Sequence, residues 1–418
     1  MSFKKGRKDS ERNKTIETAK KSFVHGLSEE LISEKKILLA HNYYKIRGGE
    51  DESCESEKKL LTEKGHKIHF YEEHNRRIDD IGFIRTALNS IWSGETYSNV
   101  KKILSEERFD LIHVQNFFPL LSPSIYYAAK SKGVAVVQSL HNYRLLCPGA
   151  LFFRNGQVCE ECLNKPIPYP GIIHSCYRNS LPGSAVVCAM LTYHSMIKTW
   201  DKMVDIYIAN TEFSRQKYIE NGFSPHKIIV KPNFVYPDPG CGSGKGNYAI
   251  YSGRLSEEKG LKTLLKAWEK IGKNFTLKIA GSGPLEKKIK NKSNVELLGG
   301  LPVTELYPIM GEATFLIFPS EWYETFGRVA IEAFAKGTPV IASNIGAIAE
   351  VVTTERTGLL FQPGNVEDLT EKIEWMLSHD LSRMRKEARN EYETKYTAER
   401  NYELVMNIYN IALERNNK

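Results

Sequence analysis

The segment "LIFPSEWYETFGRVAIEAFAKGTPVIAS" at residues 316–343 decides the fold. It passes from a continuous apolar run through a polar turn into a helical pattern, and then into a second apolar run. Apolar runs without alternation are typical of strands that are buried on both faces. The helical part gains an apolar side from Val329, Ile331, Ala333 and Phe334. Since Gly337 is suited to end that helix, the segment predicts a strand, loop, helix and strand of a parallel sheet.

Two glutamates eight positions apart flank the start of the predicted helix. Glu324 lies in the loop before the helix, and Glu332 lies inside it. Backbone N–H groups near Phe326, Gly327 and Arg328 would point from the helix start, where anions bind readily. An anion-binding helix start between two carboxylates suits a sugar nucleotide, because phosphates go to the N–H groups and hydroxyls to the carboxylates. The alternative is that the two glutamates only cap and solvate the helix.

The alternation of strand and helix runs along the chain twice. In the first half, we expect strands at 36–41, 66–72, 110–115, 134–140, 205–210 and 227–233. In the second half, we expect them at 248–253, 276–281, 295–299, 314–320, 338–343 and 357–362. The Pro- and Gly-rich residues 234–247 between the halves are typical of a linker. The pattern predicts an α/β protein with two parallel-sheet domains that face a central cleft.

These patterns also predict where the domains begin and end. Residues 1–34 are expected to be a polar extension, and the first domain is expected to run from 35 to 233 with a Cys-rich insertion at 144–182. The second domain is expected at 248–395, followed by a helix at 396–418.

The composition restricts the classes of partner. The chain has 418 residues, 41% hydrophobic residues and a formal net charge of +8, which suits phosphorylated ligands or an anionic membrane surface. The positive charge is too dispersed to indicate nucleic acid, so no nucleic-acid partner is expected. Residues 1–23 hold basic residues but no apolar segment like that of a secretory signal, and no run of about 20 apolar residues occurs. We therefore expect a cytoplasmic protein, with any membrane contact peripheral and at the inner face.

Several polar residues follow predicted strands and would lie at the cleft. Arg254 and Lys259 belong to the turn "SGRLSEEKG", where a cationic fork and a point charge suit a diphosphate. Gly48 and Gly49 follow the first strand, and His141 ends the fourth. No G-x-G-x-x-G accompanies the first strand, which argues against a dinucleotide oxidoreductase. Taken singly, such charged residues are more often ordinary surface residues. A histidine at a strand end is structural about as often as it is functional.

The combination of "RGGED" at 47–51, "SLHN" at 139–142, "SGRLSEEKG" at 252–260, "GSGP" at 281–284 and the segment at 319–343 resembles family 4 of the retaining glycosyltransferases. The resemblance covers the chain from Lys36 onward. It implies the GT-B fold, with two Rossmann-like, doubly wound domains and a final helix at 396–418 that crosses back to the first domain. It also implies that Glu324 binds hydroxyls of the donor sugar and that Glu332 binds the ribose. Phe326 and Gly327 would offer backbone amides to sugar and phosphate.

The remaining roles are implied in the same way. Arg254 and Lys259 would neutralise the leaving diphosphate of a UDP- or GDP-linked sugar, Gly48 and Gly49 would close over the phosphates, and His141 would lie near the reacting carbon. Catalysis would be mainly electrostatic, without a covalent carboxylate nucleophile or a required metal. The resemblance implies transfer with retention of anomeric configuration. The acceptor would be a glycan or lipid-linked glycan of envelope polysaccharide or lipopolysaccharide.

The insertion after His141 contains four cysteines, and its position suggests that it borders the acceptor site. The cysteines are Cys147, Cys159, Cys162 and Cys176, of which the middle pair has C-x2-C spacing. Three interpretations stay open: a structural zinc ion, unligated thiols, and disulfides, of which the last suits a reducing cytosol least. A similar Cys-bearing insertion occurs in a subset of the family.

The segment at 180–200, "SLPGSAVVCAMLTYHSMIKTW", suits a packed core helix better than a helix on a membrane, which remains the alternative. Two other functions stay open for the whole chain. One is a nucleotide-sugar epimerase of the same fold, which the spaced glutamates and the Arg/Lys turn disfavour. The other is a zinc-stabilised nucleic-acid-binding protein that uses the clustered cysteines.

Overall fold

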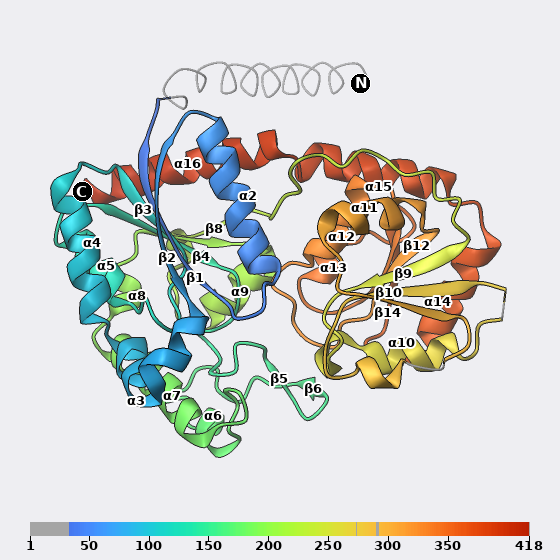
Figure 1. Cartoon of the computed structure of the whole chain (residues 1–418), viewed down its shortest axis with the longest axis horizontal. Coiled ribbons are helices and arrows are strands. Elements are labelled where there is room, and N and C mark those ends of the chain that lie inside the picture. The colour runs from blue at the N-terminus through green and yellow to red at the C-terminus, as the bar shows by residue number, and fades with distance from the viewer. Residues whose placement is uncertain (1–32, 273, 290–291, 418) are drawn as a thin grey trace, which may run out of the picture.

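The structure is a computed structural model that describes residues 33–417, except 273 and 290–291 (Figure 1). The expected polar extension at 1–34 therefore lies almost entirely outside the described residues.

The described residues fold into two parallel sheets of six strands each and one small antiparallel hairpin. The strands are β1 (Lys36–Tyr43), β2 (Lys67–His74), β3 (Leu111–Asn116), β4 (Ala135–Leu140), β5 (Phe153–Arg154), β6 (Gln157–Val158), β7 (Ile206–Ala209), β8 (Ile228–Val230), β9 (Tyr248–Ser252), β10 (Thr276–Ala280), β11 (Val295–Gly299), β12 (Phe315–Phe318), β13 (Val340–Ser343) and β14 (Gly358–Phe361).

The α-helices connect these strands and cover the faces of the sheets. They are α2 (Gly49–Glu63), α3 (Ile78–Ile91), α4 (Gly94–Glu106), α5 (Ser124–Lys130), α6 (Pro170–Ile173), α7 (Leu181–Met196), α8 (Thr199–Lys202), α9 (Glu212–Glu220), α10 (Leu261–Trp268), α11 (Val303–Glu312), α12 (Arg328–Ala335), α13 (Ile348–Val351), α14 (Val366–Ser378), α15 (Ser382–Lys395) and α16 (Ala398–Asn416).

The first sheet has the strand order β2-β1-β3-β4-β7-β8, and the second has the order β11-β10-β9-β12-β13-β14. The central strands of both sheets are buried on both faces, and β3, β4, β12 and β13 have no exposed residue. Each sheet separates two apolar clusters, which explains why its strands read as continuous apolar runs. The predicted α/β fold with two Rossmann-like domains is confirmed. Each of the twelve predicted strands overlaps an observed one, whereas the hairpin of β5 and β6 was not predicted.

The direction of winding reverses within each sheet, and ligands of such sheets bind at that point. In the second sheet the reversal lies between β9 and β12. These strands lead into the loops that carry Arg254, Lys259 and Glu324. In the first sheet the reversal lies between β1 and β3, and β1 leads to Gly48 and Gly49. The fold thus puts the expected site residues after the strands where a ligand is expected.

The last helix belongs to the core of the first domain. Figure 1 shows α15 and α16 running from the second domain along one side of the molecule to the first. Val405 and Met406 of α16 are buried together with Ile37 and Leu111 of the first sheet. The hydroxyl of Tyr409 lies 2.8 Å from Nδ1 of His113 in β3. No helix among the described residues combines the length and apolarity needed to cross a bilayer.

Candidate active site

The carboxylate of Glu324 is held by three donors in the loop after β12. Its Oε1 accepts hydrogen bonds from Lys259 Nζ at 2.6 Å, Ser320 Oγ at 2.7 Å and Trp322 Nε1 at 2.8 Å. Glu324 is only 7% exposed, so these bonds replace most of its contact with water. The structure therefore pairs the expected sugar-binding carboxylate directly with one of the expected diphosphate-binding cations.

This pairing depends on a close approach of two loops. Lys259 ends the short 3-10 helix η4 (Glu257–Lys259), and the next residue, Gly260, has φ = 68°. A Cβ at Gly260 would lie 1.7 Å from the carbonyl oxygen of Pro319, which is far inside contact distance. Only glycine lets the loop after β9 meet the loop after β12 and bring Lys259 to Glu324.

The start of α12 is shaped by a second glycine. Gly327 precedes the helix with φ = 100°, and a Cβ there would lie 2.6 Å from Cδ1 of Ile348. One helical turn later, Glu332 Oε1 accepts a hydrogen bond from Arg328 Nε at 2.9 Å. Burial raises the pKa of Glu332, and the neighbouring Arg328 opposes that rise. Phe326 is buried against Tyr396, so its side chain anchors the loop.

The first domain approaches the second at this helix start. Arg328 Nη1 donates to Ser53 Oγ of α2 at 3.1 Å. A Cβ at Gly49 would lie 3.9 Å from Cδ of Arg328, and Gly48 is the N-terminal cap of α2. The structure thus brings the glycine pair of the first domain to the Arg328–Glu332 pair of the second.

A further contact joins the loop after β4 to the loop after β12. Thr325 Oγ1 donates to the carbonyl oxygen of His141 at 2.9 Å, and Tyr143 OH donates to the carbonyl oxygen of Glu324 at 3.2 Å. The predicted residues His141 and Glu324 therefore lie in adjoining loops of the two domains.

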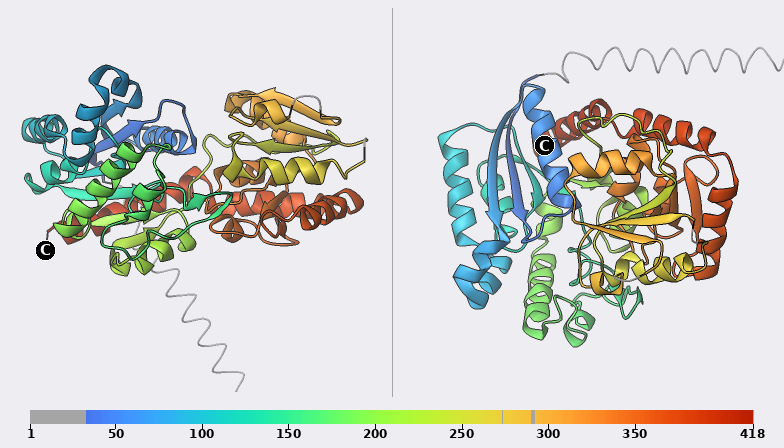
Figure 2. Two further views of the ribbon diagram at one scale, coloured as in Figure 1. Left: turned by 90° about the horizontal axis from the view of Figure 1, so that it is seen from below. Right: turned by 45° about the vertical axis from the view of Figure 1, so that its right-hand side comes forward.

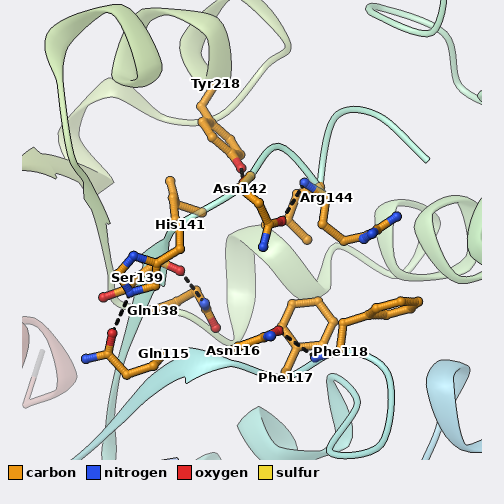
Figure 3. Close-up of a pocket in the computed structure, with 12 residues that line it drawn as sticks. Gln115, Asn116, Phe117, Phe118, Gln138, Ser139, His141, Asn142, Arg144 and Tyr218 are labelled. Carbon is orange, nitrogen blue, oxygen red and sulfur yellow. Dashed lines mark hydrogen bonds between the residues drawn. The ribbon is translucent and has the colours of Figure 1, made fainter. Parts of the chain in front are cut away.

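The ring of His141 is fixed from behind by a buried polar network. Its Nε2 lies 2.6 Å from Oε1 of Gln115, as the dashed line in Figure 3 shows. Nε2 of Gln115 donates to Glu57, whose other carboxylate oxygen accepts from Lys231 Nζ at 2.7 Å. Burial lowers the pKa of His141 to about 3, while the negative charge of Glu57 opposes that change. The imidazole is therefore neutral near pH 7, and the acceptor Gln115 selects the form with the proton on Nε2.

A small cavity of about 20 Å³ lies beside His141 (Figure 3). Asn142, Arg144 and Tyr218 line it together with residues at the ends of β3 and β4. Arg144 stacks over Phe118, with its guanidinium carbon 4.7 Å from the ring centre. The polar residues after β4 are thus held in place by aromatic packing.

Glu50, next to the glycine pair, has an unusual environment that the sequence did not indicate. Its Oε2 accepts hydrogen bonds from Tyr44 OH and from Asn142 Nδ2, both at 3.1 Å. Part of the side chain is exposed, but Oε1 is buried and has no partner among the described residues. Burial raises the pKa of Glu50 to about 7, with His41 as the main opposing charge.

Arg254, by contrast, forms only a loose side-chain ion pair among the described residues. Its side chain is 65% exposed, and its Nη1 lies 3.8 Å from Glu258 Oε1. Such a loose, exposed pair contributes little to stability. Arg254 is therefore an accessible cation at the cleft edge of the second sheet.

The structure does not support the expected zinc site. In the part of the chain that the structure describes, no group of three or more His, Cys, Asp or Glu is placed to hold a metal ion. All seven cysteines are free thiols, which also contradicts the disulfide interpretation. Other contacts fasten the insertion: Arg144 stacks on Tyr177, and the thiol of Cys188 lies 3.2 Å from the carbonyl oxygen of Pro168. The four cysteines that the sequence offered as zinc ligands, Cys147, Cys159, Cys162 and Cys176, belong to this insertion.

Known structures share this architecture. The structure of Anabaena HepE in complex with UDP and glucose has a TM-score of 0.62 at 16% sequence identity and covers 89% of this chain and 98% of that chain. The apo form of the lipopolysaccharide outer core galactosyltransferase WaaB has a TM-score of 0.59 at 16% identity and covers 91% and 99%. At such low identity these likenesses define the fold alone, which is GT-B.

Sequence comparison shows which class of enzyme the chain resembles. The family model "Glycosyl transferases group 1" matches residues 242–394, and "Glycosyltransferase Family 4" matches residues 57–238. A glycosyltransferase of Methanocaldococcus jannaschii is 34% identical over 203 residues, which are 46% of this chain and 57% of the relative, less than two thirds of its length. A Klebsiella pneumoniae protein described as lying in a cps region is 25% identical over 75% of this chain and 86% of its own. Both domains of the chain therefore resemble glycosyltransferases in sequence, and they have the GT-B fold.

Proposed function

We propose that the protein transfers a sugar from a UDP- or GDP-linked donor to a glycan or lipid-linked acceptor, with retention of anomeric configuration. The pathway would build envelope polysaccharide or lipopolysaccharide, at the cytoplasmic side of the membrane. The observation that carries the proposal is the Lys259–Glu324 ion pair, which lies at the reversal point of the second sheet beside the loop of His141. The cps-region relative and the UDP- and glucose-bound neighbour support the choice of pathway and donor.

Donor binding would exchange the partners of this pair. A diphosphate carries more negative charge than a carboxylate, so it would attract Lys259 away from Glu324 and be neutralised by the exposed Arg254 as well. The released carboxylate of Glu324 would then accept hydrogen bonds from hydroxyls of the sugar. Glu332 would bind the ribose in the same way.

Backbone groups would complete the donor site. The amides at Phe326 and Gly327 lie ahead of α12, where the helix dipole favours negative charge. Gly48 and Gly49 begin α2 on the facing domain, close to Arg328. We propose that the phosphates lie between these two helix starts.

Catalysis would follow from these charges. As the bond from the anomeric carbon to the phosphate oxygen breaks, negative charge grows on the diphosphate, and Lys259 and Arg254 stabilise it. A leaving phosphate oxygen would take the proton of the acceptor hydroxyl, which then forms the new bond on the same face. The neutral ring of His141 would border the sugar without adding a positive charge next to the anomeric carbon. The proposal assigns no step to a metal ion.

The test begins with thermal unfolding in the presence of UDP, GDP, ADP and their common sugar conjugates. A ligand that binds only the folded state raises the melting temperature, so one nucleotide family should shift it. Lys259→Ala should remove the shift. Lys262→Ala is the matched control, because Lys262 lies three residues further on and pairs with the exposed Glu257.

The same panel identifies the donor for product analysis. NMR of the product should show the anomeric configuration of the donor retained. If no nucleotide shifts the melting temperature, or if Lys259→Ala responds as wild type does, the assignment of the cleft to a nucleotide sugar is wrong. An inverted product would refute retention alone.

A further inference from the structure

The exposed large hydrophobic side chains are concentrated at one edge of the first domain. Fourteen such side chains occur among the described residues, and eleven of them lie on three neighbouring stretches. These eleven are Phe83, Ile84, Leu88 and Trp92 on and after α3, Ile167, Tyr169 and Ile173 at α6, and Leu181, Tyr193, Met196 and Ile197 on and after α7. We call the surface that they form the apolar face.

The three helices lie side by side. α7 packs against both α3 and α6, and both Figure 1 and the right-hand view of Figure 2 place them together at the lower edge of the first domain. Between α6 and α7 runs an open groove of about 370 Å³, lined almost entirely by apolar atoms. Ile167, Tyr193 and Met196 contribute to its walls. A concentration of this kind is rare on a monomer and marks an interaction surface.

The charges on these stretches have one sign. Residues 82–92 and 164–198 contain no Asp or Glu. They contain four cationic residues, all of them exposed: Arg85, Lys165, Arg178 and Lys198. The nearest acidic residues on these elements are Asp79 and Asp80 in the first turn of α3, both exposed, of which Asp79 pairs with Lys45. Before α6, Glu161 pairs with Arg154. The stretches that carry the apolar side chains therefore have a net positive charge.

This charge pattern distinguishes between two candidates for binding to the apolar face, a second copy of the chain and a lipid surface. A symmetric dimer through the apolar face would place the same four cations of each copy near those of the other, without a carboxylate between them. An anionic lipid surface offers the opposite charge to all four. It also accommodates Trp92, Tyr169 and Tyr193, because aromatic rings of this type prefer the level of the lipid headgroups.

We propose that the apolar face binds the surface of a bilayer that contains anionic lipids, with the exposed side chains of α3 and α7 inserted among the headgroups. Binding of the apolar face to a bilayer does not depend on the proposed function. Only the use of that binding, access to a lipid-linked acceptor, rests on the proposed function. The insertion begins shortly after His141 and leads directly into α7, so it connects the candidate site to the apolar face along the chain.

Vesicle flotation with the full chain tests the proposal. Vesicles of phosphatidylcholine with added phosphatidylglycerol should carry the protein upward, and pure phosphatidylcholine or high salt should reduce that binding. The double variant Ile84→Glu/Met196→Glu should bind about tenfold more weakly, because it puts two anions on the face. Both side chains are more than 75% exposed, so the variant should fold. Leu377→Glu, on α14 of the second domain, is the control.

Each outcome decides the matter. Equal flotation of wild type and the double variant, or no flotation of wild type with anionic vesicles, would overturn the proposal. A wild-type dimer in sedimentation that the double variant dissociates would assign the face to a second copy instead. Nucleotide-dependent thermal shifts, measured on the same proteins, report the donor site separately. A failure of lipid binding is thereby distinguished from a failure of the proposed function.

Discussion

Glu50 should make the stability of the protein depend on pH in a predictable direction. Its pKa is about 7 in the folded protein against 4.5 for an ordinary glutamate, because its carboxyl group is buried. The folded state therefore binds more protons than the unfolded state between these values, and stability falls as pH rises through that window. A difference of about 2.5 pKa units corresponds to at most about 3.4 kcal/mol, of which about 2.5 kcal/mol is lost between pH 5 and pH 8.

Glu50→Gln should abolish this loss. Glutamine has the same shape and can still accept the hydrogen bonds of Tyr44 and Asn142, but it cannot ionise. Urea unfolding of wild type and variant at pH 5 and pH 8 measures the effect, since all other titrating groups cancel in the difference between the two proteins. Relative to wild type, the variant should gain about 2 to 3 kcal/mol of unfolding free energy between pH 5 and pH 8.

A matched control for that experiment lies in the same helical turn. Glu52→Gln removes one negative charge from a carboxylate whose nearest cation is Arg47 at 3.5 Å. It reports the effect of net charge alone. If the difference between Glu50→Gln and wild type were the same at pH 5 and pH 8, the carboxyl group of Glu50 would not be buried as the structure has it.

Three further changes test other parts of the site. Gly260→Ala should cost about 2 kcal/mol or more of unfolding free energy in urea, because of its positive φ and the contact with Pro319, whereas Gly300→Ala, in open space, should cost less than about 1 kcal/mol. Lys231→Met should cost about 3 to 5 kcal/mol, since it leaves the buried Glu57 without its cation; a cost near zero in the same assay would refute the buried pair. Glu324→Gln should lower sugar transfer at least about 10²-fold with an unchanged circular dichroism spectrum, and wild-type turnover would remove Glu324 from the mechanism.

Most of the fold follows from the sequence because buried parallel strands have no polar face. Runs such as 110–115 and 134–140 lack alternation, and their positions agree with β3 and β4. The hairpin of β5 and β6 escaped prediction because two-residue strands in an irregular insertion carry no periodicity. The zinc interpretation gains no support among the described residues. C-x2-C spacing fixes two cysteines locally, whereas the positions of the other two depend on how the whole insertion folds.

The place of many site residues after strand ends was predictable, but their contacts were predictable only between residues that are close in sequence. Glu332 and Arg328 are four positions apart on one helix, so their pairing follows from helical geometry. Gln115, Glu57 and Lys231 come from β3, α2 and the segment after β8, and they meet behind His141 only after the first domain has folded. Nothing local distinguishes such residues from ordinary polar ones.

The charges of the site suggest an order of events for donor binding. Lys259 is occupied by Glu324, and Arg328 by Glu332, before any ligand arrives. Arg254 is the accessible cation at that edge, so a diphosphate would meet it first, at the small energies typical of exposed charges. Lys259 would then exchange the carboxylate of Glu324 for a phosphate of the donor. Glu324 would therefore be released only once the phosphates are in place. Because Thr325 of that loop also donates to the carbonyl oxygen of His141, the exchange would act on both domains. Under the proposed function, the ion pair would thus couple occupation of the phosphate site to the availability of the carboxylate that binds the sugar.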